Sequence, residues 1–313
     1  MLGKTAGGLF WMARLLERAE NTSRMIETGQ RIALTRAGSG ADDWLSVLQA
    51  AAVAYGYQQK HTEVLPELAI DWMLRDPDNP SSVMAVVTQA RHNARLVRTA
   101  LTYEAWEAVN SFWMLLKEAL ARKVATRDLP KVLSLIRERN ALVRGAILGT
   151  MLRNEIYDFI RIGTFIERAD NTARILDVKY YVLLPSAAAV GSRLDNVQWD
   201  TILRSVSGEG GYRLTIGPDV TPMGIAQFLI LDKRMPRSLN FCCGKLRDNL
   251  NYLATDYDLR LSCHHQADTL CRRFMSHDVA AIFDYGLHEY VQEVLGHLGR
   301  LSKQIEIDYR FYG

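Results

Sequence analysis

The chain has 313 residues, of which 48% are hydrophobic and 23% are charged, and its formal net charge is +3. This composition is typical of a globular protein with a substantial core, and the small net charge excludes the dense basic surface of a nucleic-acid-binding protein. No apolar run reaches the roughly 18 residues of a membrane span, and the N-terminus lacks a signal-peptide cleavage pattern. The four cysteines all lie late in the chain and are read as reduced thiols. We therefore expect a cytoplasmic protein that binds no nucleic acid and no membrane.

The first half of the chain has the pattern of successive helices. Apolar residues recur at helical spacing from Phe10 to about Ala33, and a break rich in Gly, Ser and Asp follows over 37–43. A second helix is expected from Asp43, followed by a looser segment up to Pro66. Longer amphipathic helices are then predicted over Val83–Leu101, Tyr103–Ala121 and Pro130–Arg144.

The second half continues the helical pattern. Its last helices are expected at about 238–256, 260–275 and 278–309. Segment 208–222 is the loop richest in glycine, but its counterpart near 54–64 is not glycine-rich, so it does not indicate a phosphate-binding loop. Because no convincing run alternates as a strand would, the sequence predicts an all-α protein.

One polar motif occurs in both halves. Residues 16–24 read LERAENTSR and residues 166–174 read IERADNTAR, with six of nine positions identical. We call these the ER motifs. A motif shared by both halves indicates a tandem duplication.

Further matches keep the same order at a nearly constant spacing. Trp44 matches Trp199 at an offset of 155, and the segment Pro80-Ser-Ser matches Pro236-Arg-Ser at an offset of 156. We therefore predict a helical bundle of two duplicated halves related by a pseudo-two-fold axis, with repeats over 1–150 and 151–313 that form one compact unit.

Each ER motif places a polar stripe on one helix face. On an α-helix, Glu17, Asn21 and Arg24 fall within about 60° of one another. The second copy repeats the stripe with its own side chains: Glu167, Asn171 and Arg174. The polar positions agree between the copies while the apolar ones drift, and Asn and Thr are poor helix formers that need a compensating bond. We therefore expect a sheltered stripe, although a solvated face remains an alternative.

A sheltered stripe must satisfy its own polar groups. Two sets of pairs across the axis would do so: Glu17 with Arg168 or Arg174, and Glu167 with Arg18 or Arg24. Gly163, at the position of Ala13 in the first copy, indicates that another backbone comes close. Such a network would either specify helix packing or hold a ligand with its spare donors and carboxylates.

A second repeated patch offers another candidate anion site. Arg91, Asn93 and Arg95 match Arg247, Asn249 and Asn251, so the first copy keeps more cations, although an ordinary basic helix face is an equal alternative. Both patches and both stripes together give the candidate ligand-binding residues: Glu17, Arg18, Asn21, Arg24, Arg91, Asn93, Arg95, Glu167, Arg168, Asn171, Arg174, Arg247 and Asn249.

Metal and nucleophile chemistry find little support in the sequence. The acid pairs Glu17/Glu20 and Glu167/Asp170 have a spacing that can hold Mg²⁺, but the Arg beside each acid would compete with a metal. The Cys and His residues around 263–271 fit no standard zinc spacing, and no nucleophile signature is present. We expect no metal, no cofactor and no assignable catalytic residue.

The doubled ER motif, with Glu-Arg-Ala, an acid, Asn-Thr and a later Arg in each copy, resembles the bacterial alpha-E domain family. The resemblance covers nearly the whole chain and implies an all-helical fold that is typically duplicated in tandem. It also implies partners: circularly permuted ATP-grasp ligases, transglutaminase-like proteins and an NTN-hydrolase, which are together proposed to form a peptide synthesis or modification system.

These observations favour a helical accessory protein of an ATP-grasp ligase. Its ER motifs would bind an acidic peptide, an anionic intermediate or the ligase itself. One alternative is an independent enzyme in which Glu17 and Glu167 exchange protons while Arg24 and Arg174 stabilise an anion. The other alternative is a structural scaffold.

Overall fold

The computed structural model describes residues 1–35, 41–182 and 193–312, and these residues form helices and turns without a strand. This confirms the predicted all-α class. The first half contains α1 (Gly3–Thr35), α2 (Ala41–Ala50), α3 (Ala54–Lys60), α4 (Pro66–Leu74), α5 (Val83–Leu96), η1 (Arg98–Ala100), α6 (Tyr103–Ala119) and α7 (Leu129–Thr150). The second half contains α8 (Glu155–Val182), α9 (Arg193–Ser205), α10 (Glu209–Thr215), α11 (Pro222–Ala226), η3 (Gln227–Leu231), α12 (Leu239–Asp256), α13 (Ser262–Ser276), α14 (Val279–Tyr285) and α15 (Leu287–Asp308).

Matching serine caps begin one long helix in each half. The Ser82 hydroxyl accepts a hydrogen bond from the backbone of Ala85 at the start of α5, and Ser238 does the same for Phe241 at the start of α12. Each cap satisfies a backbone donor that would otherwise have no helical partner. The repeated prolines, Pro80 and Pro236, therefore lie two residues before the caps.

Several predicted boundaries were wrong. The helix expected over 278–309 is divided at Gly286, whose φ of +108° lies in the left-handed region that interrupts a helix. The expected loop over 208–222 contains α10, and the helix expected to reach Leu101 ends at Leu96. Part of the expected break over 37–43 falls outside the described residues.

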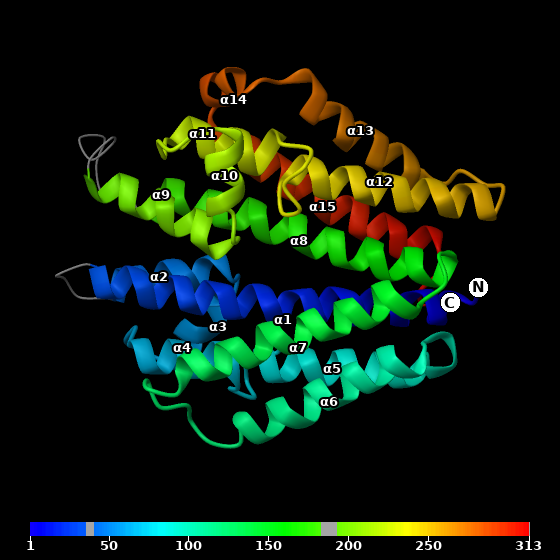
Figure 1. The fold of residues 1–313 in the computed structure, drawn as a ribbon, viewed down its shortest axis with the longest axis horizontal. Coiled ribbons are helices and arrows are strands. Elements are labelled where there is room, and N and C mark those ends of the chain that lie inside the picture. The colour runs from blue at the N-terminus through cyan, green and yellow to red at the C-terminus, as the bar shows by residue number, and fades with distance from the viewer. Residues whose placement is uncertain (36–40, 183–192, 313) are drawn as a thin grey trace.

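The two helices that carry the ER motifs, α1 and α8, pack against each other at the centre of the molecule (Figure 1). Helices α5 and α7 cover α1, while α12 and α15 cover α8. In addition, α2 contacts α8 and α9 contacts α1, so the second helix of each half crosses to the other half's ER helix. The ER motifs therefore lie where the halves meet.

A close approach of backbones fixes how the central helices cross. A Cβ atom built on Gly163 would lie 2.2 Å from the carbonyl oxygen of Phe10, which only glycine avoids. This confirms the close approach predicted from the Ala13/Gly163 position. Among the described residues, no helix is long and apolar enough to cross a membrane.

Candidate functional site

The two ER motifs exchange their Glu–Arg pairs. Arg168 donates from Nε and Nη2 to both carboxylate oxygens of Glu17, at 2.8 and 2.9 Å. Reciprocally, Arg18 donates from Nε and Nη2 to Glu167, at 2.5 and 3.0 Å. These bidentate pairs are the first of the two alternatives predicted for each glutamate.

The last arginine of each motif binds its own helix instead. Arg24 donates to Glu20 at 2.9 Å, and Arg174 donates to Asp170 at 2.6 Å. Both are pairs four residues apart along a helix. The alternatives that paired Arg24 with Glu167 and Arg174 with Glu17 are therefore wrong.

Two arginines outside the motifs complete the network around the first one. Arg237 lies in the turn before α12 and donates to Asn21 Oδ1 at 2.9 Å and to Glu20 at 2.8 Å, with Glu17 at 3.2 Å. Arg144 of α7 lies 2.8 Å from Glu20. We call the two carboxylates and their four guanidinium partners the Glu17 cluster: Glu17, Glu20, Arg24, Arg144, Arg168 and Arg237.

A smaller network surrounds the second motif. Arg14 of α1 donates to Glu167 at 2.8 Å and to the Ser302 hydroxyl of α15 at 2.7 Å. We call this network of two carboxylates and three guanidiniums the Glu167 cluster: Glu167, Asp170, Arg14, Arg18 and Arg174.

Burial and charge oppose each other at the ER glutamates. Glu17 and Glu167 are buried, and burial alone would raise the pKa of both carboxyl groups. The pKa of each carboxyl group nevertheless lies below its usual value, because nearby guanidiniums outweigh the effect of burial. At Glu17 these belong to Arg168, Arg237 and Arg144, and at Glu167 to Arg18 and Arg14. Glutamates held in the ionised form make poor proton donors near neutral pH.

Two hollows open beside the clusters. The first, which we call the Arg24 cleft, has a volume of about 590 Å³ and is lined by side chains from α1, α7 and the α9–α10 turn. Arg24 and Arg144 reach it, and Arg24 donates to the Ser207 hydroxyl at its rim at 2.7 Å. Ser207 has a φ of +54°, so the rim holds a residue in the sparsely populated left-handed region.

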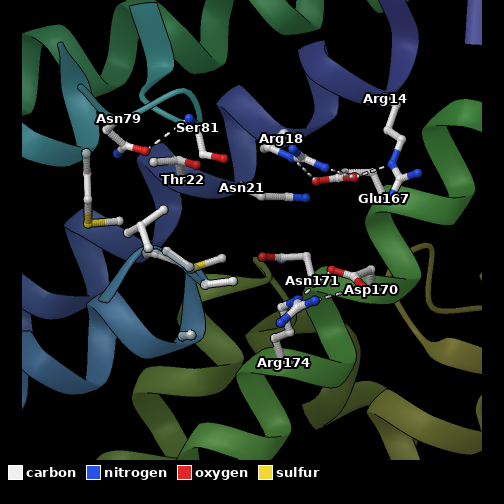
Figure 2. A pocket seen from close by; sticks show the side chains of 16 residues that line it. Arg14, Arg18, Asn21, Thr22, Asn79, Ser81, Glu167, Asp170, Asn171 and Arg174 are labelled. Atoms are coloured by element: carbon white, nitrogen blue, oxygen red, sulfur yellow. Dashed lines mark hydrogen bonds and ion pairs between the residues drawn. The ribbon is translucent and has the colours of Figure 1, made fainter. Parts of the chain in front are cut away.

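The second hollow, which we call the Asn171 cavity, has a volume of about 150 Å³. Figure 2 shows Arg18, Asn21 and Thr22 of α1 on one side of it and Asp170, Asn171 and Arg174 of α8 on the other. Ser81 and Asn79 close a third side. The Oδ1 atom of Asn171 is buried and has no hydrogen-bond partner.

The second predicted patch does not join this site. Arg91 donates to Asn110 and its guanidinium stacks 4.2 Å from the Trp113 ring, so α6 holds it. Asn93 is buried and accepts from Gln89, and Arg95 is exposed on α5. On α12, Arg247 lies near Asp248, and Asn249 donates to the Lys245 carbonyl. None of these five candidates lines either hollow.

In the part of the chain that the structure describes, no group of three or more His, Cys, Asp or Glu side chains could hold a metal ion. All four cysteines are buried as free thiols, and burial raises the pKa of Cys242 to about 12. His264 is buried with its ring nitrogens near the backbone of Leu261 and Leu250, which is a structural role.

Residues 1–309 match the family model of Alpha-E, described as "a predicted alpha-helical domain with a conserved ER motif". No curated protein and no solved structure matches the chain. The family model covers nearly the full length, and the ER pairs of that description lie at the centre of the fold. The chain therefore belongs to the Alpha-E family.

Proposed function

We propose that this chain is a helical accessory protein that binds an acidic peptide or an anionic intermediate at its ER motifs and works beside a circularly permuted ATP-grasp ligase. The ligase partnership comes from the family resemblance described above. The binding role is supported by the composition of the Glu17 cluster and by the cleft beside it. Transglutaminase-like and NTN-hydrolase proteins are further proposed partners on the same resemblance.

The excess of guanidiniums in the Glu17 cluster carries this proposal. Four arginines surround two carboxylates, so the cluster holds two positive charges more than it neutralises. Arg24 and Arg144 bring part of that excess to the Arg24 cleft, whose lining holds five arginines and four glutamates. An anion placed there would accept charge-assisted hydrogen bonds from donors already fixed in position.

The pKa of Arg237 is lowered mainly by burial and in part by the neighbouring guanidiniums. Burial, together with the guanidiniums of Arg168 and Arg24, lowers this pKa although Glu17 and Glu20 act in the opposite direction. The arginine stays protonated, since its ordinary pKa is far above neutral. An anion in the adjacent cleft would relieve this crowding of positive charge.

We also infer that the two halves are related by a pseudo-two-fold axis between α1 and α8. The reciprocal pairs Glu17–Arg168 and Glu167–Arg18 support this symmetry. The crossed contacts of α2 with α8 and of α9 with α1 support it as well. A structural role of the buried pairs is part of the same proposal, because a fixed network presents Arg24 and Arg144 to the cleft.

Binding of a fluorescent tetraglutamate peptide tests the anion site. We expect Arg144→Gln to weaken binding about tenfold, because one charge-assisted bond is worth roughly 1.5–3 kcal/mol. The matched control is Arg272→Gln on α13, an exposed arginine outside the cleft, which should bind as the unmodified chain does. Equal binding by both variants would show that the contact is non-specific and would refute the proposed site.

The ligase partnership needs a separate test. We expect the chain to co-purify with the ATP-grasp ligase and to change the product that the ligase forms. If the chain neither associates with the ligase nor changes its product, the accessory role is refuted. The anion site is tested separately by the peptide-binding experiment.

A further inference from the structure

We infer that the Asn171 cavity is a binding site for a guanidinium group on a ligand that also carries a carboxylate. Free L-arginine and an arginine side chain next to an acidic residue in a peptide both have this chemistry. The site is separate from the Arg24 cleft, so the inference goes beyond the proposed function.

The Glu17 cluster shows what normally fills this position. The repeat offset of 156 pairs Ser81 with Arg237, and the offset of 150 pairs Asn171 with Asn21. Arg237 reaches across to α1 and donates to Asn21 Oδ1 and to Glu20. Ser81 is too short to reach α8 in the same way, and the Asn171 cavity lies between Ser81 and the α8 side chains (Figure 2). The cavity is thus the place that a guanidinium occupies in the other copy.

The acceptors that would receive this guanidinium are present. Asn171 is 5% exposed and its Oδ1 has no partner, whereas Oδ1 of its counterpart Asn21 is bonded. Asp170 contacts Arg174, whereas its counterpart Glu20 contacts three arginines. An unpaired buried acceptor is costly, so a donor from a ligand gains both the bond and the relief of that cost.

The size and walls of the cavity fit an arginine-like side chain. Its volume of about 150 Å³ equals that of an engineered protein cavity that holds benzene, and a guanidinium is smaller. Apolar side chains line the same hollow, where they would cover a methylene stem: Met25, Ala50, Ala51, Ala52, Val53 and Met73.

The mouth of the cavity supplies a place for the carboxylate. Arg18 and Arg174 line it with side-chain exposures of 29% and 37%. Arg174 binds Asp170 through Nε and Nη2. Its counterpart Arg24 also donates to Ser207, but the residue that matches Ser207 at an offset of 155 is Ala52, which has no hydroxyl.

Charge also favours a ligand of mixed sign. The Glu167 cluster already has three guanidiniums for two carboxylates, so a lone cation would add to an excess. An arginine side chain next to an acidic residue in a peptide adds no net charge, whereas free L-arginine, which also carries an α-ammonium group, adds one positive charge. The ligand then completes the fourth guanidinium position and places its anion beside Arg18 and Arg174.

Calorimetric titration with L-arginine, against the isosteric L-citrulline, tests this inference. Citrulline has the same length but a neutral ureido group, so we expect it to bind at least about tenfold more weakly. Agmatine, which lacks the carboxylate, should also bind more weakly than arginine. An acetylated and amidated Arg-Glu dipeptide distinguishes the sources: tighter binding than free arginine indicates a peptide, and weaker binding indicates the free amino acid.

Two variants connect the binding to the cavity. Ser81→Arg supplies the missing guanidinium from the chain itself and should abolish arginine binding. Asp170→Asn removes a carboxylate acceptor without filling the cavity and should weaken binding about tenfold, so it carries the test if Ser81→Arg does not fold. Arg144→Gln should leave arginine binding unchanged, which separates this result from the tetraglutamate experiment. Equal binding of citrulline, or unchanged binding to both cavity variants, would overturn the inference.

Discussion

The two ER motifs differ in what lies next to the buried asparagine of each: the Arg237 guanidinium next to Asn21, and a cavity next to Asn171. In the Glu17 cluster, the Arg237 guanidinium lies among Glu17, Glu20 and Asn21 and occupies the space next to the Asn21 amide oxygen. In the Glu167 cluster, Ser81 stands at the matching position and a cavity remains next to Asn171. The difference between Arg237 and Ser81 therefore accounts for much of the contrast between a bonded Oδ1 at Asn21 and an unpaired Oδ1 at Asn171.

This comparison separates what the two ER motifs share from what they do not. Both copies keep the exchanged Glu–Arg pairs that join α1 to α8, so the shared part of the network is structural. Of the positions that differ, Ser81 and Ala52 line the Asn171 cavity and Ser207 lines the Arg24 cleft, whereas Arg237 contacts Glu17 and Glu20. Residues at the hollows can thus differ while the exchanged pairs between α1 and α8 are kept.

The largest effect is expected when the glutamates are neutralised one at a time. Glu17→Gln leaves Arg168 and Arg237 as buried cations without this partner, so we expect a loss of about 3–5 kcal/mol in unfolding free energy. Glu167→Gln should cost less, because Arg14 and Arg18 are closer to solvent. Urea denaturation measures both values. Equal losses, or a greater loss at Glu167, would contradict the deeper burial of the guanidinium partners of Glu17.

Removal of the Arg237 side chain should have the next largest effect on stability. Arg237→Ala should lower the unfolding free energy by about 2–3 kcal/mol, less than Glu17→Gln, because Glu17 and Glu20 keep other guanidinium partners. A crystal structure of this variant should show a new cavity beside Asn21. A loss below 0.5 kcal/mol without such a cavity would mean that Arg237 does not fill the space next to Asn21.

The contact between α1 and α8 can be tested without changing any charge. Gly163→Ala places a methyl group against the Phe10 carbonyl, and the backbone shift should cost about 1–3 kcal/mol. Gly145→Ala on α7 is the matched control, because nothing lies within 4 Å of a Cβ there. That control should be neutral or slightly stabilising in thermal unfolding. If both variants melt alike, the close approach of the ER helices is wrong.

Asp158 is a carboxylate on α8 outside both clusters, and its pKa contrasts with those of the ER glutamates. Burial and the nearby Asp256 raise the pKa of Asp158 to about 7, in contrast to the lowered values at the ER glutamates. Because the fold binds this proton more tightly than the unfolded chain does, ionisation of Asp158 costs stability increasingly from about pH 4 to pH 7.

Asp158→Asn removes that cost. We expect the variant to be more stable than the unmodified chain by about 1 kcal/mol at pH 8 and equally stable at pH 4. Thermal melts at the two pH values measure the difference. A variant that is destabilised at pH 8 would show that the ionised carboxylate is satisfied in the fold.

The helical class could be predicted from sequence because apolar residues recur at helical spacing. The exchanged pairs could be predicted because the ER motif occurs twice. The copies agree at Glu17, Arg18, Glu167 and Arg168, and a buried acid needs a cation from somewhere, so the pairing across the halves followed from chemistry. The close approach at Gly163 followed from the small residue in both copies.

Arg144 and Arg237 could not be predicted from the same pattern because they are not repeated. Arg144 comes from α7, far from either motif, and only the packing of α7 on α1 brings it to Glu20. Arg237 did leave a signal: it interrupts an otherwise matched Pro-x-Ser segment in which the first copy has Ser81. A difference inside a repeat was therefore more informative about the hollows than the agreement was.

The boundaries that were wrong depend on single residues. Helical periodicity continues through Gly286, so the sequence pattern alone does not show that a positive φ divides α14 from α15. In segment 208–222, the abundance of glycine favoured a loop, but packing of Tyr212 in the core outweighs that propensity and α10 forms.

A double-mutant cycle between Glu17 and Arg168 tests the central claim most directly. The unmodified chain, Glu17→Gln, Arg168→Gln and the double variant would be compared by urea denaturation at pH 7. If the two motifs meet in the interior as a bidentate pair, the coupling energy should be about 2–3 kcal/mol. A coupling energy near zero would show that the two side chains do not interact, and the account of exchanged ER pairs would then be wrong.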